Sequence, residues 1–332
     1  MPEFRQNLAT REWVILSPGR AGRPNDFIKA KEKRPQVPEH DSECPFCPGN
    51  EERSEKPVYT YSNGDTWQVR VVPNKFAALK PDLATTRSQV GRFLGAKGFG
   101  IAEVVIEHPR HDLSIATMEK EDVAQVLSAY RNRYIDIRGN DKINLVTIFR
   151  NHGARAGTSL AHPHSQIIAT PIVPPHVRYP MEQAVMYYDR FGRCVYCDML
   201  EEEIEQKERI IMETENFVTF CPYASRSPFE TRIYPKKHKA SYMLIDNNEI
   251  DELADVLRTV LGKLRVCLDD PDYNYIIRSS PVGDENTRHL HWYMVLIPKI
   301  STPAGFEIGS GIYINSMPPE DAARYLRETD WP

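Results

Sequence analysis

The sequence predicts an α+β protein that consists of two similar units in tandem, each an antiparallel sheet with one long helix on one face. Three observations support this prediction: two long amphipathic segments, strand-like runs that flank each of them, and a spacing between histidines that occurs twice. The length of 332 residues is sufficient for two domains of ordinary size. We therefore expect one unit at residues 1–190 and a second at residues 191–332.

The two helices are predicted from apolar residues that recur at the i, i+3, i+4 and i+7 spacing of a single helix face. This pattern covers residues 118–137 in the first unit and the segment from Ile250 to Leu264 in the second. Asp246 and Glu249 precede the second segment in the arrangement of a capping box. Both helices are expected to cover a sheet with their apolar face.

The strands are predicted from short runs that are rich in β-branched and aromatic residues. Such runs occupy residues 143–151 and 164–173 in the first unit, and residues 230–235 and 289–298 in the second. They flank the predicted helices, as expected when a sheet and its covering helix belong to one unit.

The composition excludes several classes of protein. A net charge of −4 gives no general field that would attract nucleic acid or an acidic membrane, so contacts with phosphate must depend on individual Arg or Lys residues. The amino terminus has no secretory signal, and no run reaches the ~18 apolar residues of a membrane span, which predicts a cytoplasmic protein. In that compartment the six cysteines are not expected to form a disulfide framework.

Two sets of cysteines and histidines predict two metal sites. Each unit contains a C-x-x-C pair and two histidines that are 51 positions apart, the second of which opens a His-x-His sequence. Two thiolates and two imidazoles complete a tetrahedral zinc site without an open position, so the expected role is structural. The alternative is a pair of reduced, buried cysteines without metal. We expect two zinc ions per chain, held by Cys44, Cys47, His111 and His162 in the first unit and by Cys194, Cys197, His238 and His289 in the second.

The second histidine of the first His-x-His sequence is the candidate for chemistry. Residues two apart on a strand face the same side, so His164 is predicted beside His162 but free of the metal. The alternative is a core histidine bonded to a backbone carbonyl. The neighbouring residues favour a phosphate site, because a glycine-rich loop with hydroxyl groups precedes His164, Gln166 follows on the same face, and arginines lie near the amino terminus. These loop residues and arginines are Gly153, Gly157, Thr158, Ser159, Arg20 and Arg23.

Seven segments, in order and over nearly the whole chain, resemble the galactose-1-phosphate uridylyltransferase branch of the histidine-triad superfamily. They are RQNLATREWVILSPGRAGRP, CPFCPGNE, VVPNKFAAL, PRHDLS, FRNHGARAGTSLAHPHSQ, PFETRIYPKKH and HLHWYMVLIP. The resemblance includes the ADP-glucose phosphorylase members, which carry C-x-x-C pairs in both halves. It implies two histidine-triad-like domains, of which the first is catalytic and the second degenerate, and it implies a homodimer.

The resemblance also implies a ping-pong transfer of a nucleoside monophosphate from a nucleotide sugar to a sugar 1-phosphate or to phosphate. His164 is implied as the nucleophile that holds the nucleotide as a covalent phosphoramidate. Donors such as Gln166 and Ser159 suit the charge on the transferring phosphoryl group. Substrate contacts are expected from Arg20, Arg23, Asn151, Gly157 and Thr158. In the second half, His291 is expected at the position of the nucleophile and Tyr293 at that of Gln166.

Two further features distinguish between members of the superfamily. Hydrolases carry a third histidine where this chain has Gln166, so transfer is favoured over hydrolysis. Gly311 and Met317 fall where the bacterial uridylyltransferases use a glutamate and a glutamine to hold hexose hydroxyls, which favours the ADP-glucose phosphorylase type. A nucleotide hydrolase and a zinc-bearing nucleotide-binding module without turnover stay open as alternatives, and the sequence does not specify the base.

Overall fold

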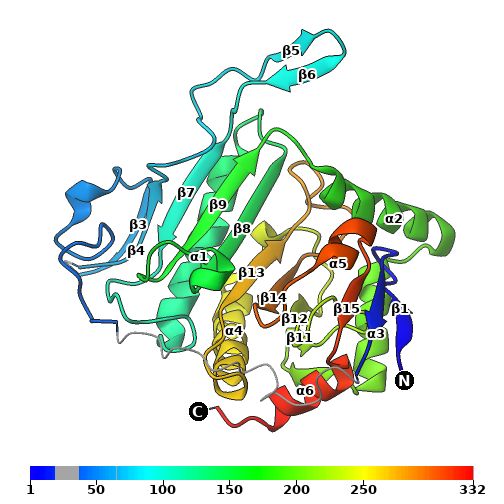
Figure 1. The fold of residues 1–332 in the computed structure, drawn as a ribbon. Coiled ribbons are helices and arrows are strands. Elements are labelled where there is room, and N and C mark those ends of the chain that lie inside the picture. The colour runs from blue at the N-terminus through cyan, green and yellow to red at the C-terminus, as the bar shows by residue number, and fades with distance from the viewer. Residues whose placement is uncertain (19–36, 65, 332) are drawn as a thin grey trace.

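A computed structural model describes residues 1–18, 37–64 and 66–331, and its largest sheet runs through both halves of the chain (Figure 1). Ten antiparallel strands form this sheet in the order β10-β11-β12-β14-β13-β8-β9-β7-β4-β3. The two halves meet at its centre, where Tyr275 on β13 lies opposite Arg150 on β8. The strands are β3 (Tyr59–Asn63), β4 (Thr66–Pro73), β7 (Ile101–Ile106), β8 (Leu145–His152), β9 (His164–Thr170), β10 (Ile210–Glu213), β11 (Phe217–Phe220), β12 (Thr231–Pro235), β13 (Tyr273–Arg278) and β14 (Tyr293–Pro298).

The same order of elements occurs in each half. The first half contains β7, α1 (Lys120–Arg138), β8 and β9, and the second contains β12, α4 (Asn247–Cys267), β13 and β14. The predicted capping box of α4 is present, since the Asp246 carboxylate accepts from the Glu249 N–H and Glu249 accepts from the Asp246 N–H. The predicted α+β class with two tandem units is therefore confirmed.

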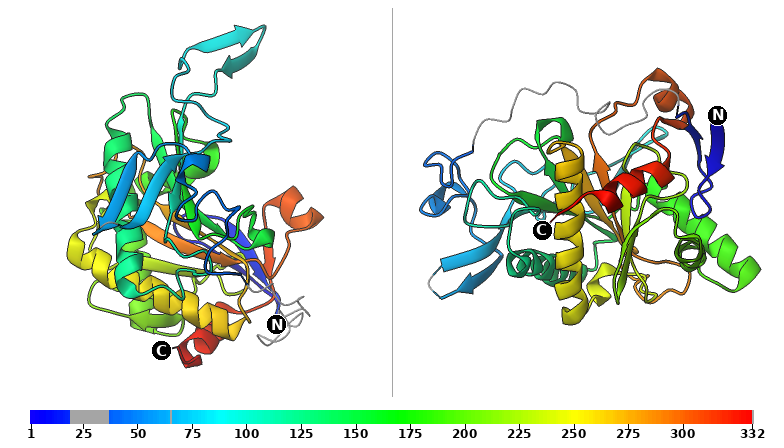
Figure 2. Two further views of the ribbon diagram at one scale, coloured as in Figure 1. Left: turned by 90° about the vertical axis from the view of Figure 1, so that its left-hand side faces the viewer. Right: turned by 90° about the horizontal axis from the view of Figure 1, so that it is seen from below.

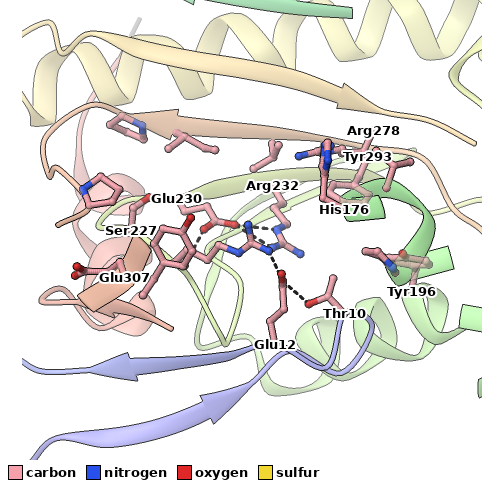
Figure 3. A pocket seen from close by; sticks show the side chains of 18 of the residues that line it. Thr10, Glu12, His176, Tyr196, Ser227, Glu230, Arg232, Arg278, Tyr293 and Glu307 are labelled. Carbon is pink, nitrogen blue, oxygen red and sulfur yellow. Dashed lines mark hydrogen bonds and ion pairs between the residues drawn. The ribbon is translucent and has the colours of Figure 1, made fainter. Parts of the chain in front are cut away.

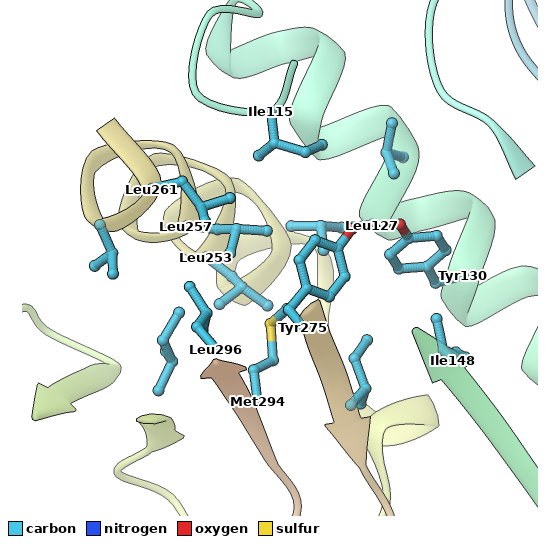
Figure 4. Close-up of a cluster of buried hydrophobic side chains, with 14 of the residues drawn as sticks. Ile115, Leu127, Tyr130, Ile148, Leu253, Leu257, Leu261, Tyr275, Met294 and Leu296 are labelled. Carbon is cyan, nitrogen blue, oxygen red and sulfur yellow. Dashed lines mark hydrogen bonds between the residues drawn. The ribbon is translucent and has the colours of Figure 1, made fainter. Parts of the chain in front are cut away.

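Helices α1 and α4 lie side by side on one face of the large sheet (Figure 2). Their apolar faces pack with the sheet into one core that contains residues from both halves, such as Tyr130, Leu257 and Tyr275 (Figure 4). The side chains of β14 alternate between the two faces of the sheet, and those of Met294 and Leu296 point into this core. The neighbouring residues of β14 therefore face the opposite side of the sheet, where the candidate sites lie.

A second, three-stranded sheet connects the two ends of the chain. Strand β2 (Trp13–Leu16) pairs with β1 (Glu3–Gln6) and, in parallel, with β15 (Tyr313–Asn315). The amino-terminal strands thus lie beside the carboxyl-terminal half, although a boundary near residue 190 would assign them to the first unit. That boundary stays a prediction.

The other described elements surround these sheets. The hairpin of β5 (Arg87–Val90) and β6 (Phe93–Ala96) projects away from the body of the molecule (Figure 1). No helix in the described ranges is both long enough and apolar enough to cross a membrane. The remaining helices are η2 (Glu51–Arg53), η3 (Ala154–Ala156), α2 (Pro175–Phe191), α3 (Val195–Gln206), η4 (Tyr242–Leu244), α5 (Gly305–Ser310) and α6 (Pro319–Glu328).

Candidate active site and metal centres

The first predicted metal group is assembled in the structure from three separate segments. Cys44 and Cys47 come from the C-x-x-C loop, His111 follows β7, and His162 stands two residues before β9 begins. Each of the four side chains offers one ligand atom, all of these atoms lie within 4.8 Å of one another, and all four residues are buried. The sequence prediction therefore identified the complete group.

The separations in this group fit a tetrahedral metal ion. Bond lengths of about 2.3 Å to sulfur and about 2.0 Å to nitrogen require edges of roughly 3.3 Å between two nitrogens and roughly 3.5 Å between sulfur and nitrogen. Cys47 Sγ lies 3.4 Å from His111 Nδ1 and 3.6 Å from His162 Nδ1, and the two Nδ1 atoms are 3.3 Å apart. The other ring nitrogen of His162 lies 2.8 Å from the His108 carbonyl oxygen, which fixes the ring in the orientation that a ligand needs.

The second metal group differs from the prediction in one residue. The structure brings together Cys194, Cys197, His238 and His291, with Cys197 Sγ at 3.3 Å from His238 Nδ1 and 3.5 Å from His291 Nδ1. The ring of His289, which the sequence analysis assigned as the fourth ligand, instead packs against Tyr188 of α2. The assignment of His289 is therefore corrected to His291.

The reason for this error is the length of one connection. The histidine that completes each group stands two residues before a strand, so the start of the strand determines which histidine it is. His291 precedes β14 just as His162 precedes β9. The segment from Arg278 to Tyr293 is two residues longer than the corresponding segment from Asn151 to His164. The repeated spacing of 51 positions therefore indicated the wrong member of the second His-x-His sequence.

We expect His291→Ala to remove one metal equivalent per chain, whereas His289→Ala leaves the metal content unchanged. The two histidines are two positions apart, so each variant is the control for the other. Elemental analysis of the purified variants measures the difference. Metal loss in His289→Ala with full retention in His291→Ala would reverse the assignment.

His164 begins β9 on the face of the sheet opposite the helices, and only 8% of its surface is exposed. Its Nδ1 atom lies 2.8 Å from the His162 carbonyl oxygen. Because a carbonyl oxygen only accepts hydrogen bonds, Nδ1 must carry the proton, which leaves the lone pair on Nε2. The alternative of a histidine bonded to a carbonyl is thus true of Nδ1, and the other nitrogen keeps its lone pair in a fixed orientation.

Several groups around His164 keep its imidazole neutral and in place. Burial is the main cause that lowers the pKa of His164, the bond to the His162 carbonyl opposes it, and the positive charge of Arg150 adds to the lowering. The Phe46 ring, from the C-x-x-C loop, packs against the imidazole with 5.7 Å between ring centroids. The first metal group therefore positions the candidate nucleophile from two directions, through His162 and through Phe46.

A buried polar network lies behind His164 on the helix side of the sheet. Arg150 forms an ion pair with Glu107, which is fully buried, and the Tyr130 hydroxyl lies 3.1 Å from the Glu107 carboxylate. The same hydroxyl lies 2.6 Å from Ser165 Oγ and 2.6 Å from the Tyr275 hydroxyl of the other half. The Arg150 charge is thereby compensated, as a buried charge requires.

The glycine loop before His164 has backbone conformations that favour glycine, and the second half of the chain shapes it. Gly153 and Gly157 have φ angles of +84° and +92°. A Cβ atom at Gly153 would lie 2.1 Å from an oxygen of Asp272, whose carboxylate also accepts from the Arg155 N–H at 2.7 Å. The loop must therefore carry glycine at position 153 for both conformational and steric reasons.

Asn274 is a further residue of this site that the sequence analysis missed. It lies on β13 opposite Asn151, and its Nδ2 atom donates to Asn151 Oδ1 at 2.8 Å and to the Ala156 carbonyl at 2.9 Å. No local signal identifies it, because its role depends on the pairing of β13 with β8. Asn274 orients both the Asn151 amide and the glycine loop.

The other predicted site residues take different positions. Gln166 follows His164 on the same face of β9, and Thr158 and Ser159 lie in the loop, with Ser159 exposed and the Thr158 hydroxyl donating to the Leu160 carbonyl at 3.2 Å. Arg20 and Arg23 fall outside the described residues. Gln166 therefore shares a face of β9 with His164, Thr158 and Ser159 lie in the loop that leads to it, and the roles of these residues stay predictions.

The strand registers also correct the comparison of the two halves. His291 corresponds to His162. The residue that corresponds to His164 is therefore Tyr293, and the expectation that it would be His291 is wrong. Arg278 lies opposite Tyr293 on β13 and so corresponds to Asn151. The second half therefore has a tyrosine in place of the candidate nucleophile.

The fold and the site together define the class of protein. A family model described as the N-terminal domain of galactose-1-phosphate uridyl transferase matches residues 1–174, more than half of the chain, and a model described as a domain of unknown function matches residues 108–328. The chain therefore belongs to the galactose-1-phosphate uridyl transferase family.

Its similarity to individual relatives covers nearly the whole chain. ADP-glucose phosphorylase of Arabidopsis thaliana is 38% identical over 333 residues, which cover 98% of this chain and 93% of the relative. Galactose-1-phosphate uridylyltransferase of Thermotoga maritima is 30% identical over 339 residues, which cover 99% of each chain. The crystal structure of an Arabidopsis thaliana ADP-glucose phosphorylase with bound ADP-glucose is 35% identical, with a TM-score of 0.86 and full coverage of both chains. The relatives are thus enzymes of two related specificities.

Proposed function

We propose that this protein is a nucleotidyltransferase of the ADP-glucose phosphorylase type, with ADP-glucose as donor and phosphate as acceptor. The observation that carries the reaction class is the geometry of His164, whose Nδ1 proton is held by a backbone carbonyl and whose Nε2 lone pair is left for attack. The similarity to the Arabidopsis thaliana ADP-glucose phosphorylase supports the choice of donor.

In the proposed first step, His164 Nε2 attacks the α-phosphorus of the nucleotide sugar. A nitrogen–phosphorus bond forms, the bond from that phosphorus to the bridging oxygen breaks, and glucose 1-phosphate leaves with the electron pair. In the second step an oxygen of inorganic phosphate attacks the same phosphorus, the bond to Nε2 breaks, and ADP is released. His164 thereby returns to its starting state, and Nδ1 keeps its proton throughout.

The residues next to His164 support both steps by positioning the phosphoryl group. The Gln166 amide and the Ser159 hydroxyl are the donors for its charge, and the backbone N–H groups of Gly157 and Thr158 suit its oxygens. Asn151 is oriented by Asn274 and contributes a further amide to the same region. Fixed donors of this kind lower the barrier because they need no rearrangement as charge develops.

We propose zinc as the metal in both Cys/His groups. The donor set of two thiolates and two imidazoles in each group, together with the tetrahedral separations, supports this identity. A bound zinc ion would supply a structural anchor for β9 and β14 and would leave no open position for catalysis. We also propose that the protein is cytoplasmic and forms a homodimer. The contact between the subunits stays a prediction.

The experiment that tests the function is intact-protein mass spectrometry after brief incubation with ADP-glucose or UDP-glucose, without an acceptor. We expect a mass increase of one adenylyl group with ADP-glucose, and we expect added phosphate to remove it with release of ADP. This follows because a ping-pong enzyme stops at the covalent intermediate when no acceptor is present.

The same experiment distinguishes the other functions. A uridylyl adduct that forms only with UDP-glucose, and that galactose 1-phosphate removes, would favour the uridylyltransferase activity that the name of the Thermotoga maritima relative states. Steady release of nucleoside monophosphate without acceptor would indicate a hydrolase. Binding without any adduct or turnover would indicate a nucleotide-binding module and would contradict the proposal.

A further inference from the structure

Two residues hold the backbone of His164, one on each side of it. Ser165 follows His164 on β9, and its side chain faces the helix-covered side of the sheet, because neighbouring residues of a strand point to opposite sides. On the other side of His164, the Pro163 carbonyl accepts the Glu107 N–H at 3.1 Å. Since His164 Nδ1 donates to the His162 carbonyl, the direction of the imidazole depends on this short piece of backbone.

The Tyr130 hydroxyl connects the side chains of these two residues. It lies 2.6 Å from Ser165 Oγ and 3.1 Å from the Glu107 carboxylate, and the Tyr275 hydroxyl is a third neighbour at 2.6 Å. A phenol hydroxyl has one proton to donate and two lone pairs that accept, so it can bond to three neighbours at the same time. Tyr130 is therefore the common partner of the two residues that hold the backbone of His164.

The other groups in this network are themselves fixed. Glu107 forms an ion pair with Arg150, and Tyr275 on β13 lies opposite Arg150 on β8. Burial raises the pKa of Tyr130 well above its ordinary value, so its hydroxyl keeps the proton that these bonds need. The position of α1 and of β13 is thereby transmitted to the start of β9.

The network has no direct access to a substrate. Its five residues are at most 2% exposed, and none of them lines the cavity that Figure 3 shows among the described residues of the carboxyl-terminal half. An effect of the network on the reaction must therefore pass through a residue on the other face of the sheet. His164, next to Ser165 on β9, is the residue in that position. The five residues are Glu107, Tyr130, Arg150, Ser165 and Tyr275.

We propose that Tyr130 is a positioning residue for His164 and fixes the direction of the Nε2 lone pair through Ser165 and Glu107. This inference rests on the proposed function and adds to it a residue from the helix side of the sheet. Attack on phosphorus requires the lone pair to point at one atom, and a displacement of about 1 Å can lower the rate about 10²-fold. Loss of the Tyr130 hydroxyl releases both attachments of this backbone.

Tyr130→Phe tests the proposal, because it removes one oxygen atom and keeps the ring in the core. In a single turnover with ADP-glucose, followed by mass spectrometry, we expect the adduct to form about 10-fold more slowly than in the wild type. The concentration of ADP-glucose that gives half of the maximal rate should not change, and neither should the metal content. Loss of rate without loss of binding or metal is expected of a misplaced nucleophile.

Tyr242→Phe is the matched control for this change. Tyr242 is also fully buried, and its hydroxyl donates to the Leu127 carbonyl of α1 at 2.9 Å. Each variant loses a buried hydroxyl and should unfold at a lower temperature than the wild type. Only Tyr130→Phe should slow formation of the adduct. Equal rates in the two variants would overturn the positioning role of Tyr130.

Ser165→Ala provides a second test, which applies even if Tyr130→Phe does not fold. We expect this variant to slow formation of the adduct as well. Combined with Tyr130→Phe, it should be no slower than the slower single variant, because both changes break the same contact. A wild-type rate in Ser165→Ala, or effects that multiply in the double variant, would contradict a path through Ser165.

A measurement that needs no turnover separates this inference from the proposed function. The Nδ1 proton of His164 is identified as the NMR resonance that is lost in His164→Asn. We expect this proton to exchange with solvent faster in Tyr130→Phe than in Tyr242→Phe, because the bond to the His162 carbonyl is held less firmly. Equal exchange in both variants would overturn the role of Tyr130, whereas a wild type that forms no adduct would contradict only the proposed function.

Discussion

Replacement of His164 by asparagine is expected to abolish formation of the nucleotidyl adduct and to lower the rate of transfer by about 10⁴-fold or more, as loss of a nucleophile does in other covalent enzymes. The physical reason is specific to one atom. The asparagine amide can still donate to the His162 carbonyl, so the local fold is maintained, but it provides no lone pair at the position of Nε2. Mass spectrometry and a coupled assay of sugar 1-phosphate release measure the two effects.

His176→Asn is the matched control for this change. His176 is an exposed histidine on α2, so its replacement should leave both the adduct and the rate unchanged. The metal content and unfolding temperature of His164→Asn should equal those of the wild type. A persistent adduct in His164→Asn would eliminate His164 as the nucleophile, whatever the donor.

Replacement of Cys47 by serine is expected to remove one metal equivalent and to destabilise the amino-terminal half. Cys47 Sγ contacts the ligand nitrogens of both His111 and His162, so its loss opens the group that connects the C-x-x-C loop to β9. Because metal binding is coupled to folding, we expect a loss of about 3 kcal/mol or more in the free energy of unfolding. In a thermal unfolding experiment this corresponds to a decrease of about 4 °C or more.

Cys221→Ser is the control, because Cys221 is also fully buried but belongs to neither metal group. It should keep both metal equivalents and lose only the smaller amount of stability expected for a buried thiol replaced by a hydroxyl. A Cys47→Ser protein with full metal content and the stability of the wild type would show that the four side chains form a metal-free cluster.

The metal groups and the sheet together explain how a surface loop can support precise chemistry. His164 is held by the His162 carbonyl, His162 belongs to a metal group, and Asn274 from the other half orients the glycine loop before His164. The first half provides the candidate nucleophile, and the second half provides the strand that completes its surroundings. The surroundings of His164 therefore depend on the single sheet that runs across both halves.

The sequence by itself determined the types and approximate places of the functional residues. Cysteine pairs and histidines are recognisable because few other residues bind zinc, and the first group was predicted completely as Cys44, Cys47, His111 and His162. The two helices were predictable because their apolar periodicity is a local property. The glycine-rich loop with Gly153 and Gly157 was likewise recognisable from its composition, whereas its positive φ angles are seen only in the structure.

Only the tertiary structure decided the identity of His291 and the role of Asn274. Both depend on the hydrogen-bonded register between strands that are far apart in the sequence. The segment between β13 and β14 is two residues longer than its counterpart in the first half, and this changes which histidine joins the second metal group. The ion pair between Glu12 and Arg226 likewise joins segments that are far apart in the sequence. Local composition contains no information on such pairings, because their free energy comes from contacts that exist only after the chain has folded.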